Sequence, residues 1–481
     1  MANGTHGASR PDVVLLTIDC LRADRLGSAG YRRPTTPNLD RLAGRALSLR
    51  QAISCGPDTQ ASFPAIHTSS YPLMYCDPQG YDWVSARRTT LAEVLSRAGY
   101  ATCGITANPF LSRVFGYDRG FDRFVDFQAA AGAGPEERLV GSIKRVVSPK
   151  RFGYAYLRRL RHMVQVFGGR RPYQPADLLI ARALEWMRAA PRPFFLWIHF
   201  MDLHYPQLPR PASLRRFRPD GLRRTAHVAL LSRLLDRSTE LGPADAELVS
   251  NLYDAQIHFI DQQLEPLLSA LGRSRAVVAV TSDHGELLGE KGRFGHGFTD
   301  LPEALLRVPM LLAHPDHKTA RESASLVSLL DLAPTLASLA GAAPPDNWHG
   351  VSFARLLGDP AATVRTDAIA QRGLSRSFVC ARRNTRWKFV ANYDAGARAL
   401  YDIVVDPAEA RNLVEERPDV AREHELELRA HFQQHGELYA LRLEQRGDLE
   451  TRLKTGLETR GYTEEEERRM LEHLSDLGYV D

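Results

Sequence analysis

Short runs of consecutive apolar residues alternate along the chain with stretches of helical periodicity. The apolar runs lie at residues 13–18, 194–198, 276–280 and 308–312, and helical apolar spacing occurs at 39–46, 91–98, 178–187 and 326–339. A short, continuous apolar run is typical of a strand that is buried on both faces. Strands of this kind alternating with helices predict a mostly parallel sheet that helices cover on both sides, and therefore an α/β fold.

Side chains that can bind a metal ion or an anion directly follow three of these runs. They are Asp19 after the first run, His199 with Asp202 and His204 after the second, and Asp283 with His284 after the third. In open α/β sheets, functional groups collect beyond the carboxyl ends of the strands. We therefore expect residues from distant parts of the sequence to meet at one edge of the sheet.

Three parts of the chain depart from this α/β pattern. Residues from about 128 to 175 and from about 211 to 241 are rich in Arg and lack strand signals, so we interpret them as insertions. Beyond Arg372 the pattern changes to short strand-like pieces and turns, and from Asp448 onward the chain is charged and helix-prone. The predicted organisation is a large α/β domain over 1–371, a smaller C-terminal α+β subdomain over 372–440 and a helical tail over 441–481.

The composition is that of a folded globular protein, because 44% of the 481 residues are hydrophobic. The chain contains no run approaching the roughly 20 apolar residues of a membrane-spanning helix. Its first residues also lack the charged and apolar regions of a signal peptide. These features predict a cytoplasmic protein without a transmembrane segment. Five scattered cysteines without a Cys-x-x-Cys pair do not indicate a disulfide scaffold.

Much of the formal net charge of +5 lies between Lys144 and Arg171, a segment with no Asp or Glu. Such a segment can contact nucleic acid or anionic lipid. It lacks regular aromatic interleaving, however, so we interpret it as a solvated basic insertion and expect no nucleic-acid partner. The sequence indicates no particular oligomeric state.

The strongest chemical signal is Thr281-Ser282-Asp283-His284-Gly285-Glu286, which directly follows an apolar run. A carboxylate beside an imidazole supplies oxygen and nitrogen ligands that suit a hard or borderline divalent cation. A single Asp-His pair is common in structural roles, so this motif gains its meaning from the other motifs of the chain.

These other motifs occur in a characteristic order. They are Asp19-Cys20 in IDCLRAD; Thr36-Pro37-Asn38-Leu39-Asp40; Cys55-Gly56-Pro57-Asp58-Thr59; Gly99-Tyr100; Arg119-Gly120-Phe121-Asp122; His199-x-x-Asp202-x-His204; Gly295-His296-Gly297; Arg307-Val308-Pro309; and Leu400-Tyr401-Asp402. In order and spacing, the chain resembles the sulfatase branch of the alkaline phosphatase superfamily over nearly its whole length. The resemblance implies that family's central, mostly parallel sheet with flanking helices and hydrolysis of an anionic ester.

The resemblance also implies one divalent cation, held by Asp19, Asp283 and His284 together with the nucleophile. Sulfatases commonly have a second acidic residue directly after the first, whereas this chain has Cys20. That departure, together with the Asp-His pair, favours Mn, Mg or Zn over Ca, although all four cations remain candidates.

Two residues compete for the position of the nucleophile. Typical sulfatases carry Cys-x-Pro-Ser-Arg, whose cysteine is oxidised to formylglycine; Cys55-Gly56-Pro57 begins that motif, but Asp58-Thr59 replaces its Ser-Arg. Aligning the following helix places the nucleophile at Thr59, as in related phosphotransferases. A hydroxyl that contacts a divalent cation loses its proton readily and becomes nucleophilic. We therefore favour Thr59 and expect no formylglycine.

Further positions resemble the substrate-binding residues of the family. His204 and His296 would hydrogen-bond the anionic group or protonate the leaving oxygen. Lys291 and Arg293 are candidate contacts to the anion. Asn108 partly substitutes for the lysine and histidine of the family's Gly-Lys-Trp-His motif, which is absent.

The leading hypothesis is a metal-dependent hydrolase that cleaves a small phosphate, phosphonate or sulfate ester through a covalent intermediate on Thr59. A threonine ester has no second hydroxyl to expel sulfate, which favours phosphate or phosphonate, whereas the resemblance favours sulfate. Three alternatives remain: a transferase that passes the phosphoryl-linked group to an alcohol, a formylglycine sulfatase that uses Cys55, and a non-catalytic member that binds anions.

Overall fold

A twisted central sheet forms the middle layer of the molecule. The computed structural model describes residues 10–72, 84–85, 87–126, 163, 165–168, 171–234, 240–372, 379–393 and 395–434. The sheet has the strand order β11-β2-β10-β6-β1-β5-β3-β4, with β9 paired to β2. Its strands are β1 (Asp12–Ile18), β2 (Leu47–Ile53), β3 (Ala101–Thr106), β4 (Arg123–Asp126), β5 (Phe194–Phe200), β6 (Ala276–Thr281), β9 (Arg307–Val308), β10 (Met310–Ala313) and β11 (Arg321–Ser328).

The centre of the sheet is parallel, as predicted. Strand β1 pairs in parallel with β5 and β6, and β3 pairs in parallel with β5 and β4. Each residue of β1 is buried, which explains the uninterrupted apolar run at this position. The carboxyl ends of β1, β3, β5 and β6 therefore meet at one edge of the sheet.

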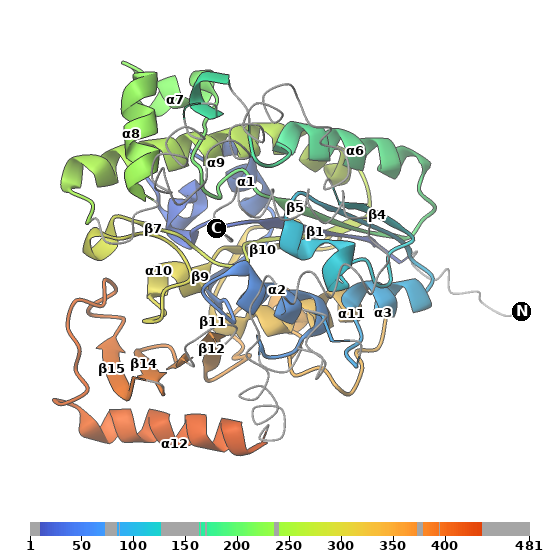
Figure 1. Cartoon of the computed structure of the whole chain (residues 1–481). Helices are drawn as coiled ribbons and strands as arrows, with labels where there is room; N and C mark the ends of the chain where they lie inside the picture. Colours follow the sequence, from blue (N-terminus) through green and yellow to red (C-terminus); the bar gives the residue numbers. More distant parts are fainter. Residues whose placement is uncertain are drawn as a thin grey trace, which may run out of the picture.

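Helices cover both faces of this sheet (Figure 1). The helices on one face are α1 (Pro37–Ala43), α6 (Ala176–Ala189) and α9 (Pro243–Gly272), and those on the other are α2 (Thr59–Thr68), α3 (Leu91–Arg97) and α11 (Leu332–Leu339). Alternate residues of β1 serve the two layers, because successive strand side chains point to opposite faces. Val14 packs in the cluster that contains Leu39 and Leu264, and Leu15 packs in the cluster that contains Phe63 and Leu336.

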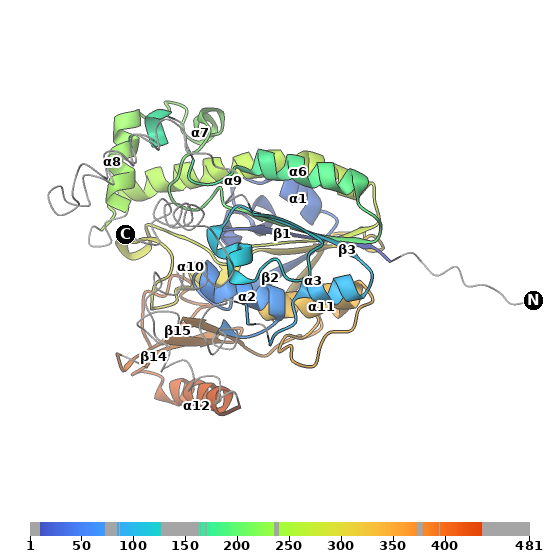
Figure 2. The same ribbon diagram turned by 45° about the vertical axis from the view of Figure 1, so that its right-hand side comes forward.

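A smaller antiparallel sheet follows the central one and packs beneath it (Figure 2). It has the order β12-β13-β14-β15, formed by β12 (Ala368–Arg372), β13 (Val379–Arg383), β14 (Trp387–Asn392) and β15 (Ala397–Asp402). Leu428 of helix α12 (Pro418–Gln434) shares a cluster with Phe389 on one face. On the other face, Val390 packs with Ile53 of the central sheet. The small sheet is thus held against the large one by apolar contacts.

The structure corrects two details of the sequence-based prediction. The run at 308–312 is interrupted at Pro309 and forms β9 and β10, which are antiparallel to their partners. The stretch 326–339 was predicted to be helical throughout, but its first residues complete β11 and only Leu332–Leu339 forms α11. The β-branched Val327 and the apolar residues around it fit the pattern of a helix as well as that of a buried strand. Pairing with β2 makes this segment a strand.

The remaining elements border the functional edge or lie outside the main layers. Helices α7 (Pro211–Phe217) and α8 (Arg224–Leu234) lie within the predicted insertion 211–241, and the 30-residue α9 was not predicted. Short elements at the functional edge are β7 (Leu287–Leu288), β8 (Phe294–Gly295) and α10 (Glu303–Leu306). Most of the predicted insertion 128–175 and the whole tail 441–481 lie outside the described residues. Within the described part, no helix has the length and apolar character to cross a membrane.

Candidate active site

Four residues from three separate segments meet beyond the carboxyl ends of β1 and β6. Asp19 directly follows β1, Thr59 is the first residue of α2, and Asp283 and His284 follow β6. Nε2 of His284 lies 3.4 Å from Oγ1 of Thr59, 3.6 Å from Oδ1 of Asp19 and 3.4 Å from Oδ2 of Asp283. All four side chains are buried. The structure therefore brings together the four metal-ligand candidates that the sequence indicated.

The donor set fits a divalent cation. Ligand atoms of Asp19, Asp283 and His284 lie within 4.8 Å of one another. Both carboxylate oxygens of Asp283 are buried and have no hydrogen-bond partner. His284 is the ion-pair partner of Asp283, but two buried carboxylates beside one imidazole still cost several kcal/mol unless a further positive charge compensates them. Two carboxylates, one imidazole and one hydroxyl suit Mn²⁺, Mg²⁺ or Zn²⁺.

Electrostatics within the site indicate where positive charge is needed. Burial raises the pKa of Asp283, and the neighbouring Asp19 raises it further. Burial opposes the charge on His284, but the two carboxylates outweigh this effect and raise its pKa to about 9. Nδ1 of His284 lies 2.8 Å from the carbonyl oxygen of Gly285, to which it donates, so Nε2 faces the carboxylates. A cation, either a proton on Nε2 or a metal ion, is required at this point.

Two further side chains hold Asp19 in place. Nδ2 of Asn108 donates to Oδ2 of Asp19 at 3.2 Å, and Nε2 of His199 lies 3.4 Å from the same oxygen. The contact with His199 helps to keep the pKa of Asp19 below its usual range, although burial acts in the opposite direction. Asn108, predicted to contact substrate, thus contacts a predicted metal ligand. Such contacts fix the orientation of a ligand and tune its basicity.

The two substrate-binding histidines predicted from the sequence lie together beside this cluster. The ring of His296 lies 5.1 Å from that of His204 and 4.5 Å from that of His284. Nδ1 of His296 also lies 3.2 Å from Oε1 of Glu286. Burial lowers the pKa of His204 to about 4. Glu286 belongs to the Asp-His-Gly-Glu motif, but the sequence alone did not reveal its contact with His296.

Lys291 and Arg293 are positioned differently. Both guanidinium ends of Arg293 are engaged by Asp300, at 2.9 and 2.8 Å. Nζ of Lys291 lies 5.7 Å from the ring centre of Tyr401. Within the described residues, neither side chain hydrogen-bonds or pairs with the carboxylate cluster, so the role of Lys291 and Arg293 in binding an anion stays a prediction. The sequence did not single out Arg372, whose Nε lies 3.4 Å from Oδ2 of Asp58, the residue before Thr59.

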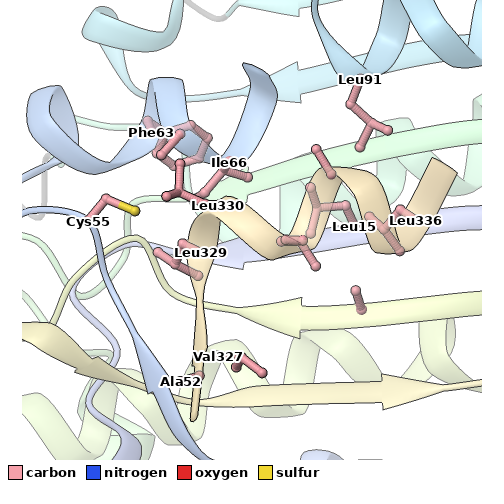
Figure 3. Close-up of a cluster of buried hydrophobic side chains, with 14 of the residues drawn as sticks. Leu15, Ala52, Cys55, Phe63, Ile66, Leu91, Val327, Leu329, Leu330 and Leu336 are labelled. Carbon is pink, nitrogen blue, oxygen red and sulfur yellow. The ribbon is translucent and has the colours of Figure 1, made fainter. Parts of the chain in front are cut away.

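Cys55, the competing nucleophile, lies in the apolar core. Figure 3 shows its sulfur among the buried side chains of Phe63, Leu329 and Leu330. Sγ lies 3.3 Å from Oγ of Ser328, and burial raises the pKa of the thiol to about 11. The hydrogen-bonding contact of this thiol is thus with Ser328 and not with Asp19, Asp283 or His284. Thr59, not Cys55, therefore faces the carboxylate cluster.

Comparison with known proteins identifies the family. The profile of the family described as Sulfatase matches residues 11–342. This chain belongs to the sulfatase family. A second profile, described as the C-terminal part of N-sulphoglucosamine sulphohydrolase, matches residues 289–435. The expected family and fold are thus confirmed, and the protein is a hydrolase of the sulfatase family.

The relatives are similar at low sequence identity. A "Sulfatase" of Formosa agariphila is 24% identical over 83% of this chain and 82% of its own length, and an "Arylsulfatase" of Clostridium perfringens is 23% identical over 84% and 90%. The match to "Arylsulfatase K" of Mus musculus, at 26% identity, spans only 52% of each chain. These names describe the relatives, and the substrate of this sulfatase-family chain requires separate argument.

Solved structures confirm the fold. The phosphonate monoester hydrolase of Agrobacterium radiobacter has a TM-score of 0.68 at 20% identity and covers 89% of this chain and 96% of its own. A protein in complex with its substrate D-glucosamine-2-N,6-O-disulfate has the same TM-score at 16% identity and covers 89% and 98%. At these identities the likeness establishes the architecture alone.

Proposed function

We propose that this sulfatase-family protein hydrolyses an anionic ester through a covalent intermediate on Thr59. One observation carries the proposal: Oγ1 of Thr59 lies 3.4 Å from Nε2 of His284, within the cluster of carboxylates. Thr59 also stands at the amino terminus of α2, where the helix dipole favours negative charge. The hydroxyl is thus placed where an attacking oxyanion is stabilised.

Asp19, Asp283, His284 and Thr59 would hold the divalent cation. When bound, the cation lowers the pKa of a hydroxyl that it contacts and neutralises charge on the ester oxygens. The protein's own residues position the reacting groups: Asn108 and His199 orient Asp19, and the backbone of Gly285 orients His284. This arrangement supports a dependence of the activity on one divalent metal ion.

The proposed reaction has two displacements. Thr59, having released its proton to solvent, attacks the sulfur or phosphorus atom, and the bond from that atom to the alcohol oxygen breaks. His296 protonates the leaving oxygen, because burial lowers the pKa of His204 to about 4 and leaves that ring neutral. Water then attacks the same sulfur or phosphorus atom and breaks its bond to Thr59, which regenerates the hydroxyl and releases the inorganic anion. The net reaction consumes one ester and one water.

A sulfate ester is the substrate class that the family and its named relatives favour. A phosphate or phosphonate ester is the second candidate, and a specific observation supports it. With Thr59 as nucleophile the intermediate has no second hydroxyl to expel the anion, so water must attack directly, which is ordinary chemistry at phosphorus. The substrate panel must therefore contain both kinds of ester.

Substitutions at positions 59 and 55 test the nucleophile. We expect Thr59→Ala to lower kcat/KM by at least about 10³-fold for the best of four substrates: an aryl sulfate, an aryl phosphate, a phosphodiester and a phosphonate monoester. Thr59→Ser keeps the hydroxyl and should retain part of the activity. Cys55→Ala is the matched control and should retain nearly all of it. Full turnover by Thr59→Ala would overturn the proposal.

Two further measurements separate the alternative functions. Mass spectrometry of rapidly quenched enzyme should find the added group on the peptide with Thr59 and an unmodified thiol at Cys55; formylglycine at position 55 would favour the conventional sulfatase mechanism. Product analysis with an added acceptor alcohol distinguishes hydrolysis from transfer. A predominant alcohol adduct would establish a transferase.

A further inference from the structure

A second group of ligand atoms adjoins the oxygen-rich cluster. Atoms of Cys20, His284 and His296 lie within 4.8 Å of one another. Sγ of Cys20 lies 3.7 Å from Nδ1 of His296 and 3.0 Å from Oδ1 of Asp19. Cys20 and His284 are buried. A thiol with two imidazoles differs chemically from the carboxylate set, because sulfur and nitrogen ligands select borderline and soft cations.

The backbone around Cys20 is held in an unusual conformation that keeps this thiol at the site. Cys20 has a φ of 62°, in the left-handed region that non-glycine residues rarely adopt. The hydroxyl of Tyr253, on α9, donates to the carbonyl oxygen of Cys20 at 2.6 Å and accepts from the backbone nitrogen of Arg22 at 3.0 Å. Such a conformation persists where the surroundings fix it.

We propose that Cys20, His284 and His296 form a second binding position for a thiophilic divalent cation such as Zn²⁺. This position is distinct from the oxygen-rich position of Asp19, Thr59, Asp283 and His284. Zinc binds cysteine and histidine together in many protein sites, whereas Mg²⁺ and Mn²⁺ prefer oxygen ligands. The buried carboxylate of Glu286, 3.2 and 3.3 Å from Nδ1 of His296, adds negative charge beside the proposed position.

The two positions exclude each other because they share one atom. Nδ1 of His284 donates to Gly285, which leaves a single lone pair, on Nε2, for a metal ion. One chain therefore holds one ion, either in the oxygen-rich set with Thr59 or in the sulfur-containing set without it. Given the proposed function, zinc in the second position inhibits ester cleavage. The occupancy itself does not depend on catalysis.

Binding at the second position releases two protons, one from the thiol of Cys20 and one from Nε2 of His284. The thiol of Cys20 donates to Oδ1 of Asp19. When the cation binds, the S–H bond breaks, a sulfur–metal bond forms and the proton leaves to solvent. The proton of the neutral His296 ring moves from Nδ1 to Nε2, so that the lone pair of Nδ1 exchanges its contact with Glu286 for the cation. No oxidation state changes.

Cobalt reports directly on the sulfur ligand, because Co²⁺–thiolate pairs show a charge-transfer band in the near ultraviolet. We expect metal-free wild-type protein titrated with Co²⁺ to develop this band, saturating at one ion per chain, and Cys20→Ser to lack it. Cys103→Ser is the matched control, since Cys103 is a buried free cysteine in β3 outside both sets, and it should keep the band. No band in the wild type, or a persistent band in Cys20→Ser, would overturn the proposal.

Manganese competition tests the exclusion and also shows that Cys20→Ser is folded. Both proteins are loaded with Mn²⁺, which is followed by electron paramagnetic resonance. One equivalent of Zn²⁺ should release the Mn²⁺ from the wild type, whereas Cys20→Ser should retain it. Cys20→Ser should need at least about tenfold more Zn²⁺ for the same release. If Cys20→Ser does not fold, His296→Ala replaces it and should weaken the cobalt band. Simultaneous binding of both ions, or equal zinc requirements, would refute the exclusion.

The test of the second metal position can fail or succeed independently of the test of ester hydrolysis. Thr59→Ala should keep the cobalt band in full, because Thr59 is not in the sulfur-containing set. If the manganese-loaded protein hydrolyses no ester but the band appears, the proposed function fails and the second metal position stands. If hydrolysis is found without the band, only the second position fails.

Discussion

The ammonium group of Lys388 pairs with the carboxylate of Glu409 between the C-terminal sheet and the loop after His296. Lys388 is completely buried, and its Nζ also donates to the carbonyl oxygen of Leu301 at 2.6 Å. Glu409 accepts from the backbone nitrogen of Glu303 at 2.8 Å. A buried ion pair thus ties the smaller sheet to the segment that leads away from the active site.

Lys388→Met should destabilise the protein by about 3–5 kcal/mol, because it leaves Glu409 buried without its counter-charge. Denaturant unfolding measures this change. The double variant Lys388→Met with Glu409→Gln should recover much of the loss. Arg411→Met is the matched control: Arg411 pairs with Glu416 at the surface, so its loss should cost less than about 1 kcal/mol. Equal effects of the two single variants would contradict this account.

Asp283→Asn should have opposite effects on stability with and without metal. Without metal, the amide removes one of the two buried carboxylates that share His284, and we expect a gain of about 1–3 kcal/mol. With saturating Mn²⁺, the wild type should be the more stable form, because it alone keeps both carboxylate ligands. Thermal unfolding with chelator and with Mn²⁺ measures both effects.

Asp261→Asn provides the contrasting control for Asp283→Asn. Asp261 is also buried, but its oxygens accept hydrogen bonds from the backbone nitrogens of Asn38 and Leu39 and from the side chain of Asn38. An amide nitrogen there would face donors, so we expect destabilisation under both conditions. A gain in stability from Asp261→Asn would show that the effect at Asp283 is not due to its missing partners.

Asn108→Ala separates a ligand-orienting role from a substrate-binding role. Because Asn108 donates to Asp19, the substitution should weaken Mn²⁺ binding by about 10–100-fold. At saturating Mn²⁺, KM for the ester should change little. An increased KM at saturating metal with unchanged metal affinity would instead restore the direct substrate contact predicted from the sequence.

Buried neutral histidines should make the protein sensitive to acid. Burial lowers the pKa of His67 from 6.5 to about 3, within an aromatic cluster with Phe63 and Trp197. Below pH 6.5 the unfolded chain takes up a proton at this position that the folded chain does not, so stability falls as the pH falls. The loss from His67 alone reaches about 2 kcal/mol near pH 5.

His67→Leu should reduce the loss of stability between neutral pH and about pH 5 by this amount. Comparing denaturant unfolding at the two pH values cancels the effect of the substitution on packing. An unchanged pH dependence in His67→Leu would show that His67 is not held neutral in the folded protein. His204 and His424, whose pKa values burial also lowers to about 4, would then account for the acid sensitivity.

The sequence predicted the centre of the fold because burial alone determines those strands. Strands β1, β5 and β6 are buried along their whole length, so their apolar runs are uninterrupted, and the polar residues at their ends necessarily share one edge. The direction of β10 was not predictable in this way, because an antiparallel strand and a parallel strand with the same burial have the same apolar pattern.

Within the active site, the sequence predicted residues at strand ends but not contacts that depend on the path of a loop. Their positions at strand ends indicate Asp19, Asp283 and His284 as candidate ligands, and the resemblance to sulfatases selects them from the other polar residues at strand ends. The pairing of Arg293 with Asp300, by contrast, depends on the path of a loop, and any surface arginine fits the same local sequence. Cys20 was noticed as a departure from the family pattern, but its distance from His296 could come only from the fold.

The direction of β10 has one more consequence. Strand β6 reaches the functional edge at Thr281, and β10 starts from that same edge, with Met310 opposite Thr281. The intervening residues, which include the His296 loop and the short strand β9, thus leave the sheet and return to it at the same edge. Both ends of the segment that carries His284 and His296 are therefore fixed by neighbouring strands, which keeps the two imidazoles at the same edge of the sheet.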